Sequence, residues 1–97
     1  MNTIELETQH TSGVYGKRDV AIVRGQGARI WDENGREYID CVGGIGVANV
    51  GHCHPVVSAA IAAQAQTLIT CQEMFYNDQR AQLLSKLAAI TPAGIDR

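Results

Sequence analysis

The chain has few aromatic residues, only two prolines and almost no excess of charge. Aromatic residues make up 5% of its 97 residues, so its apolar character comes mainly from Ala, Val and Ile. The net charge is −2 and the basic residues are scattered, which argues against a surface that follows a phosphate backbone. We therefore expect no nucleic-acid partner.

Long apolar runs are also absent. No stretch approaches the roughly 20 residues that a membrane helix needs, and residues 1–7 lack the basic and apolar regions of a secretory signal. The three cysteines, Cys41, Cys53 and Cys71, are odd in number and never form a CxxC pair. Free thiols in a reducing cytoplasm are the economical interpretation, so we expect a cytoplasmic location and no membrane partner.

The length of the chain limits it to one domain at most, with a modest core. An apolar fraction of 45% suits a globular α/β chain. Residues 1–19 are polar and weakly periodic, although Glu5–Glu7 could begin a short helical turn that Thr11–Gly13 would end. We expect residues 1–19 to form an arm that crosses a surface, and residues 20–97 to form the folded part.

A β-hairpin is predicted around Asn34-Gly35, because both positions of a tight hairpin turn need a positive φ. The flanking strands would be residues 28–32 and 36–41, and a shorter β run at 21–23, closed by glycines 25 and 27, would precede them. With a two-residue turn, period two places Arg29, Trp31, Tyr38 and Asp40 on one face and Ala28, Ile30, Ile39 and Cys41 on the other. The cross-strand pairs would be Glu33 with Arg36, Trp31 with Tyr38, and Arg29 with Asp40.

A second turn geometry fits the same hairpin residues. A four-residue turn over Asp32–Gly35, with a bulge at Gly35, would shift every cross-strand partner. The aromatic pair and the ion pair of the first geometry fall into register together, which favours the two-residue turn.

Two helices are expected after a glycine-rich stretch. Pro55 suits the first turn of a helix, where its missing N–H is not needed, and one face of 55–70 is apolar. The second helix would start after Asn77 as N-cap and end at Thr91-Pro92. The apolar positions are Val57, Ile61 and Leu68 in the first helix and Leu83, Leu84, Leu87 and Ile90 in the second.

The expected architecture is therefore a small three-stranded antiparallel meander followed by two helices, an α/β chain of the α+β type. Both helices carry apolar faces, and only one small sheet is available to cover them. The surplus predicts surfaces that pack against more protein.

Glycines concentrate where chemistry could occur: six of the ten lie between Gly25 and Gly46. The run Gly43-Gly44-Ile45-Gly46 could bring backbone close to a ligand or adopt positive φ. The bland alternative is a bulged strand connection. Phosphate binding is not supported, because no helix N-terminus follows directly. The stretch Arg24–Ile30 does not match a dinucleotide-binding fingerprint, since Ile30 replaces the last glycine and no helix follows.

His52-Cys53-His54 resembles a metal site only superficially. Adjacent residues rarely converge on one ion, and a structural zinc needs four ligands. Cys41, Cys71 and His10 would have to join from afar. We expect no metal site, and expect His52 and His54 to arrange the turn before Pro55 by hydrogen bonding.

No catalytic residue is evident. The carboxylates Asp32, Glu33, Glu37 and Asp40 are better explained as turn and strand-face charges than as an acid–base pair. The two lysines, Lys17 and Lys86, lack the desolvation or cationic neighbours that activate an amine. We therefore expect neither a catalytic nor a cofactor-binding residue in this chain.

The order of several short motifs resembles the opening segment of class III (ω-amino) aminotransferases, over nearly the whole chain from about Tyr15. Each motif is weak alone, but their order and spacing are specific. Within the family, residues 10–15 and the Gly-Gly-Ile-Gly-Val form are most similar to acetylornithine aminotransferases and to enzymes acting on carrier-protein-bound lysine or ornithine. The motifs are Arg24–Gly27, Trp31-Asp32, Gly35, Tyr38–Asp40, Gly44–Val47, Gly51-His52 and His54-Pro55.

The resemblance implies a fold-type I dimer that uses pyridoxal phosphate. Such an enzyme transfers an ω-amino group to 2-oxoglutarate in arginine or lysine biosynthesis. The segment 20–97 would be a partial small domain with the start of the link to an absent large domain, lying against the active site and the partner subunit. The resemblance also implies that Tyr15, Gly44 and Ile45 contact the substrate. Ile45 stands where an ornithine δ-aminotransferase would carry a tyrosine, which argues against free ornithine.

Members of this family are several times longer. Their phosphate-binding segment and Schiff-base lysine would follow residues 94–97, so we interpret the chain as the front of such an enzyme and expect it to be inactive alone. The alternative is a stand-alone interaction module that assembles through its exposed helix faces.

Overall fold

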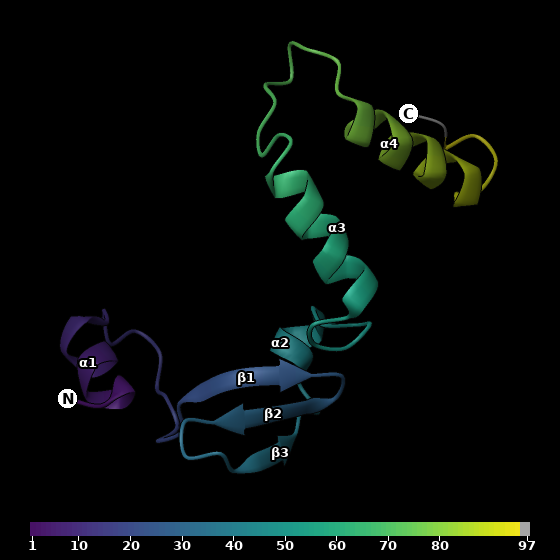
Figure 1. Cartoon of the computed structure of the whole chain (residues 1–97). Helices are drawn as coiled ribbons and strands as arrows, with labels where there is room; N and C mark the ends of the chain where they lie inside the picture. The colour runs from purple at the N-terminus through teal and green to yellow at the C-terminus, as the bar shows by residue number, and fades with distance from the viewer. Residues whose placement is uncertain (96–97) are drawn as a thin grey trace. The chain divides into compact units, whose positions relative to one another are not determined.

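The computed structural model describes residues 1–95, so the last two residues of the expected 20–97 segment lie outside the described part. The chain divides into two compact units, Met1–Ala60 and Ile61–Arg97, and each is described by itself. In chain order the elements are α1 (Thr3–His10), β1 (Ile22–Gln26), β2 (Arg29–Asp32), β3 (Glu37–Ile39), α2 (Gly43–Gly46), α3 (Pro55–Ala65) and α4 (Asp78–Ile90) (Figure 1).

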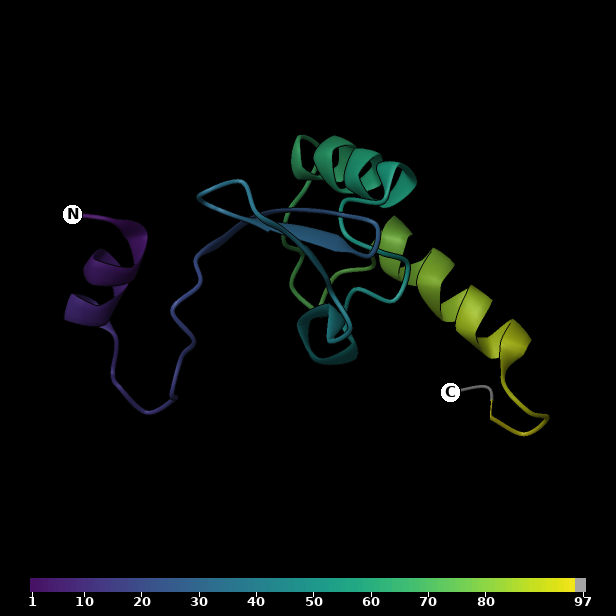
Figure 2. The ribbon, with the colours of Figure 1, turned by 90° about the horizontal axis from the view of Figure 1, so that it is seen from below.

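The short helix α1 confirms the helical turn expected in the N-terminal arm. Asn2 is its N-cap: its side chain accepts from the Glu5 amide at 2.9 Å, and the Glu5 carboxylate accepts from the Asn2 amide at 3.0 Å. This reciprocal pair is a capping box, which satisfies two amides at the start of the helix. The segment between α1 and β1 then runs as an irregular loop (Figure 2).

The three strands form the expected antiparallel meander, in the order β1-β2-β3. The expectation that β1 stops at 23 is wrong, because the strand continues to Gln26. The His52 side chain packs against β1 at Gly25, where there is no space for a side chain: a Cβ there would lie 2.8 Å from Cγ of His52. The turn to β2 follows at Gly27 and Ala28, and Gly27 has φ 56°.

The predicted register of the second hairpin is wrong by one residue, and the alternative geometry is the one observed. Trp31 faces Glu37, and Ile30 faces Tyr38. The Gly35 amide donates to the Asp32 carbonyl at 3.0 Å, and Gly35 alone in this turn has a positive φ, 80°. A four-residue turn with a bulge at glycine replaces the two-residue turn, so the expected Trp31–Tyr38 pair does not form.

The glycine-rich run after β3 is not the bulged strand connection that was considered. Gly43, Gly44, Ile45 and Gly46 all have φ between 58° and 72°, so α2 is one turn of left-handed helix. Amides donate to carbonyls four residues back, from Gly46 to Val42 at 2.9 Å and from Val47 to Gly43 at 2.8 Å.

Helix α3 begins at Pro55 as expected but ends at Ala65, before the predicted end at residue 70. The last turn tightens, with the Thr67 amide donating to the Gln64 carbonyl at 3.0 Å. The Thr67 hydroxyl also donates to the Ala63 carbonyl at 3.1 Å. These bonds satisfy terminal carbonyls of the helix, and Leu68, which was assigned to its apolar face, lies beyond its last residue.

Helix α4 matches its predicted limits. The Asn77 side chain accepts from the Arg80 amide at 3.0 Å, and Asp78 adds a negative charge to the first turn. Arg80 also donates to the Phe75 carbonyl at 2.7 Å and pairs with Glu73, so it ties the preceding loop to the helix start.

No apolar side chain is buried anywhere in residues 1–95, and Asp32 is the one buried residue among them. The apolar faces of α3 and α4 are both exposed, with Val57, Ile61, Leu83 and Leu87 all 45% exposed or more. The expected surplus of apolar surface is therefore confirmed. Within the described part, no helix is long and apolar enough to cross a membrane.

Candidate functional site

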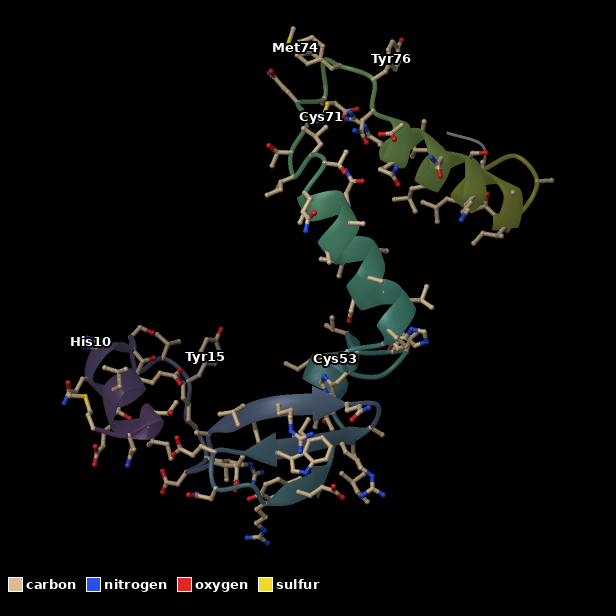
Figure 3. The ribbon with its side chains drawn as sticks, viewed as in Figure 1. His10, Tyr15, Cys53, Cys71, Met74 and Tyr76 are labelled. Carbon is tan, nitrogen blue, oxygen red and sulfur yellow. The ribbon has the colours of Figure 1, made fainter. Side chains whose placement is uncertain are left out.

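The residues expected to contact substrate fall in two places. Gly44 and Ile45 lie together in the left-handed turn α2, and the Ile45 side chain is 89% exposed. Tyr15 lies in the loop after α1, where its ring is also exposed (Figure 3). The structure thus brings two of the three together and places the third on a separate segment of the first unit.

Ile45 has the least usual backbone of the site, with φ 64° and ψ 56°. In this region the Cβ of an L-residue approaches its own carbonyl oxygen, at a cost of about 1–2 kcal/mol. For a β-branched residue the conformation is a genuine outlier. Such strain persists only where surrounding contacts impose it, and it concentrates at functional sites.

Asp40 supplies the contacts that begin this turn. Its Oδ1 accepts from the Val42 amide at 3.0 Å and from the Gly43 amide at 2.9 Å. The carbonyls of these same two residues close the left-handed turn. The Asp40 side chain thus fixes the residues from which the turn is built.

His52 holds the other oxygen of the same carboxylate. Its Nε2 lies 2.5 Å from Asp40 Oδ2, and the side chains of His52 and Asp40 are only 28% and 10% exposed. This contact replaces the Arg29–Asp40 pair expected from the sequence; Arg29 pairs with Glu37 instead. The one-residue shift in register accounts for the exchange of partners.

The backbone of His52 is itself anchored. Gly27 donates to the His52 carbonyl at 3.0 Å, and the His52 amide donates to the Gly27 carbonyl at 2.9 Å. A Cβ at Gly51 would lie 2.9 Å from Gly27 Cα, so the two backbone segments meet at residues that have no side chain. His52 therefore links the β1–β2 turn to the end of β3, whereas His54 accepts from the Val56 amide at 3.3 Å at the start of α3.

The hydrogen bond with His52 and those from the Gly43 and Val42 amides lower the pKa of Asp40 to about 2. A carboxylate that accepts three such bonds is stabilised in its charged form. Asp40 is therefore ionised at neutral pH and acts as a fixed acceptor.

Asp32 makes a second carboxylate centre, in the hairpin turn. Its Oδ1 accepts from the Asn34 and Arg36 amides, and its Oδ2 accepts from the Tyr38 hydroxyl at 2.8 Å. Burial raises the pKa of Asp32, but these hydrogen bonds outweigh it, so the net pKa lies below its usual value of 3.8. The bond to Asp32 raises the pKa of Tyr38. This centre shapes the turn, as expected from the sequence.

A mainly apolar hollow of about 960 Å³ lies between the N-terminal arm and one face of the sheet. Tyr15 lines it from the arm, and Ile30, Tyr38 and Val42 line it from the sheet and the strand end. Gly44 and Ile45 are not among its lining residues. The hollow therefore does not unite the three expected substrate residues.

Within residues 1–95, no three His, Cys, Asp or Glu side chains gather to hold a metal ion. His52 is engaged by Asp40, and the described thiols are not joined in a disulfide. Cys53 has a positive φ of 52° in the turn before α3 (Figure 3).

Comparison with known proteins identifies the family. The class-III aminotransferase family matches residues 12–97. The [LysW]-aminoadipate semialdehyde transaminase of Deinococcus radiodurans is 53% identical over 91 residues, which are 94% of this chain and 21% of that protein. The acetylornithine aminotransferase of Methanosarcina acetivorans is 43% identical over 99% of this chain and 24% of its own length.

Solved structures agree. The acetylornithine aminotransferase of Elizabethkingia anophelis superposes with a TM-score of 0.85 at 32% identity, over 90% of this chain and 23% of that one. The ornithine aminotransferase of Toxoplasma gondii, described with pyridoxal phosphate at its active site, gives 0.85 at 36% identity over 90% of this chain and 20% of its own. The chain belongs to the class-III aminotransferases, and it spans between a fifth and a quarter of the length of these relatives.

Class-III aminotransferases depend on pyridoxal phosphate, but the described residues do not fit a complete site for it. Lys17 is half exposed and pairs with Glu7, and Lys86 is exposed on α4. A Schiff-base lysine needs desolvation or a cationic neighbour to lower its pKa, and neither side chain is placed in such surroundings.

Sequence reasoning missed the pairing of Asp40 with His52. The signal was present in both residues, which stand in motifs that carry the family resemblance, but they are twelve positions apart. Only the fold brings them together.

Proposed function

We propose that this chain is the N-terminal segment of a pyridoxal-phosphate-dependent transaminase that moves an ω-amino group to 2-oxoglutarate. The amino donor is N-acetylornithine or a carrier-protein-bound lysine or ornithine derivative, as in arginine or lysine biosynthesis. The enzyme is a cytoplasmic homodimer, and the segment 20–97 belongs to its small domain, preceded by an arm at 1–19. Alone, the chain neither binds the cofactor tightly nor transaminates.

The observation that carries this proposal is the joint match in sequence and fold. An identity of 53% over 94% of the chain, to a protein named for a carrier-bound semialdehyde, coincides with TM-scores of 0.85 to acetylornithine and ornithine aminotransferases. The match covers only 20–24% of each of these relatives, which supports a segment over an independent enzyme.

We assign substrate contact to Tyr15, Gly44 and Ile45. Support comes from the exposure of Tyr15 and Ile45 and from the strained backbone that presents Ile45. An aliphatic side chain at position 45 offers a donor only apolar contact, which suits the methylene chain of an acylated or carrier-bound amine better than the charged group of free ornithine.

The direct test joins residues 1–97 to the part of the Deinococcus radiodurans relative that this chain does not match, which is about four fifths of its length. The hybrid should bind pyridoxal phosphate and transfer amino groups to 2-oxoglutarate from N-acetylornithine or from the carrier-bound donor. The matched control is that part of the relative alone, which should be inactive. A purified 97-residue chain that turns over either donor would contradict the proposal.

A second function, a stand-alone interaction module, draws support from the exposed apolar faces of α3 and α4. The two proposals differ in solution. A module should unfold cooperatively as a defined species, whereas a segment should do so only when joined to the rest of the enzyme.

A further inference from the structure

Ile45 is the only side chain in the left-handed turn α2, and its left-handed backbone conformation is unfavourable for an L-residue. An L-residue with a branched Cβ would leave this conformation if its neighbours allowed it. Glycines at 43, 44 and 46 permit the turn but do not impose it, because glycine adopts either sign of φ with similar ease.

The hydrogen bonds that impose the turn converge on one carboxylate. Asp40 accepts from the amides of Val42 and Gly43, at 3.0 and 2.9 Å, and so fixes the two residues whose carbonyls close the turn. An ionised acceptor makes stronger hydrogen bonds than a neutral one.

The carboxylate is in turn held by a residue that is fixed on two further sides. His52 Nε2 contacts Asp40 at 2.5 Å, the His52 backbone makes two hydrogen bonds with Gly27, and its ring lies where a side chain at Gly25 would be. A continuous set of contacts therefore runs from the β1–β2 turn through His52 and Asp40 to the turn that carries Ile45.

We propose that Asp40 and His52 are positioning residues, which together fix the left-handed turn Gly43–Gly46 and hence the direction in which Ile45 meets the amino donor. The inference rests on the proposed function, because it takes Ile45 to be the residue that contacts the donor. Neither Asp40 nor His52 touches the donor itself. They act through the backbone of α2.

The conformational test uses the full-length aminotransferase that carries residues 1–97 as its first segment, with residues 1–97 isotopically labelled. Scalar couplings and intraresidue amide–Hα contacts by nuclear magnetic resonance report the sign of φ at Ile45. The unmodified chain and D40N should both keep a positive φ, because the asparagine Oδ1 can still accept from the Val42 and Gly43 amides. D40A should lose it. A positive φ that survives in D40A would overturn the inference.

The kinetic test uses the full-length aminotransferase that carries residues 1–97 as its first segment, with N-acetylornithine as donor. D40A and H52A should raise the KM for the donor about tenfold and change kcat less than about twofold, as expected when binding contacts are misplaced. A merely structural role would instead lower the amount of active enzyme and leave KM unchanged. E33Q neutralises an exposed carboxylate of the hairpin turn, outside α2, and should change neither constant.

A double-mutant cycle shows whether Asp40 acts through Ile45. In the I45G background there is no side chain to direct, so D40A should alter the KM less than about twofold. An equal effect of D40A in both backgrounds would overturn the inference. If the unmodified enzyme does not use N-acetylornithine, the proposed function fails for that donor, while the sign of φ at Ile45 still decides the positioning role of Asp40.

Discussion

At the scale of single residues, two carboxylates organise the first unit. Asp32 satisfies the amides of the hairpin turn and the Tyr38 hydroxyl, and Asp40 satisfies those of the left-handed turn and meets His52. In a longer chain, buried backbone groups would satisfy such amides. Buried partners are scarce in residues 1–95, because no apolar side chain is buried there. One carboxylate side chain therefore satisfies each set of amides.

The lowered pKa of Asp40 predicts an acid-dependent turn. In the unfolded chain its pKa would be near 3.8, and in the fold it is about 2, so the stabilisation is complete above pH 4. It is lost as the pH falls through about 2, because the protonated carboxyl accepts these bonds more weakly. The amide resonances of Val42 and Gly43 should therefore shift with a midpoint near pH 2.

The control for this titration is D40N, which has no proton to gain and should show a flat response at both amides. A midpoint at or above 3.8 in the unmodified chain would show that the hydrogen bonds to Asp40 do not form in solution.

At the scale of elements, glycine decides where backbone segments meet. Gly51 has φ 87°, and a Cβ at this position would lie 2.9 Å from Gly27 Cα. Gly25, which lies within β1, likewise leaves room for the His52 ring. The β1–β2 turn and the loop before α3 thus touch because the glycines at 25 and 51 leave room, while Gly27 adopts a positive φ of 56°.

Substitution at this meeting point should be costly. G51A combines a strained φ with a clash against backbone, so it should destabilise the contact by about 2 kcal/mol or more. Hydrogen exchange at the Gly27 and His52 amides should accelerate about thirtyfold. G16A is the matched control, because nothing lies within 4 Å of a Cβ there, and it should leave both amides unchanged. Equal protection in the two variants would show that the clash is relieved without cost.

The start of α4 offers a simpler test. Asn77 accepts from the Arg80 amide, so N77A should reduce the stability of the helix by about 1 kcal/mol. N77D keeps the acceptor and should behave as the unmodified chain does. Circular dichroism near 222 nm reports the loss. Undiminished helicity in N77A would mean that Arg80, through Glu73 and the Phe75 carbonyl, holds the helix start alone.

The elements that could be predicted from the sequence are those with local chemical signals. Asn77 and Pro55 set the starts of α4 and α3, and the three strands follow from β-rich runs between glycines. The register of the second hairpin could not be settled, because Asn34-Gly35 fits two turns that differ by one residue. The left-handed turn and the Asp40–His52 pair escaped prediction because glycine permits many conformations and distant pairing needs the fold.

At the scale of the whole molecule, the described residues bury no apolar side chain, and α3 and α4 expose theirs. Figure 3 shows Met74 and Tyr76 pointing outward from the loop between these helices, and both are exposed. Apolar surface of this kind marks contact with more protein. This is what the proposed place of the chain in a longer enzyme requires.

In isolation the chain should therefore self-associate and unfold with little cooperativity. Its urea unfolding should show a shallow slope, because little surface is exposed on unfolding. Sedimentation should show species larger than 10.5 kDa. Replacing Leu83 and Leu87 together by glutamate should reduce the association, whereas the same change at Gln79 and Gln82 should not. A sharply cooperative monomer would support the stand-alone module instead.

The turn at Gly43–Gly46 also has a consequence for handedness. Three of its four residues are achiral, so Ile45 alone carries a stereocentre, and that stereocentre opposes the screw sense of the turn. A mirror-image residue would favour this sense without strain. Chemical synthesis of the 97 residues with D-alanine at position 45 should therefore give a turn more stable than its L-alanine counterpart, the reverse of the order expected in a right-handed turn.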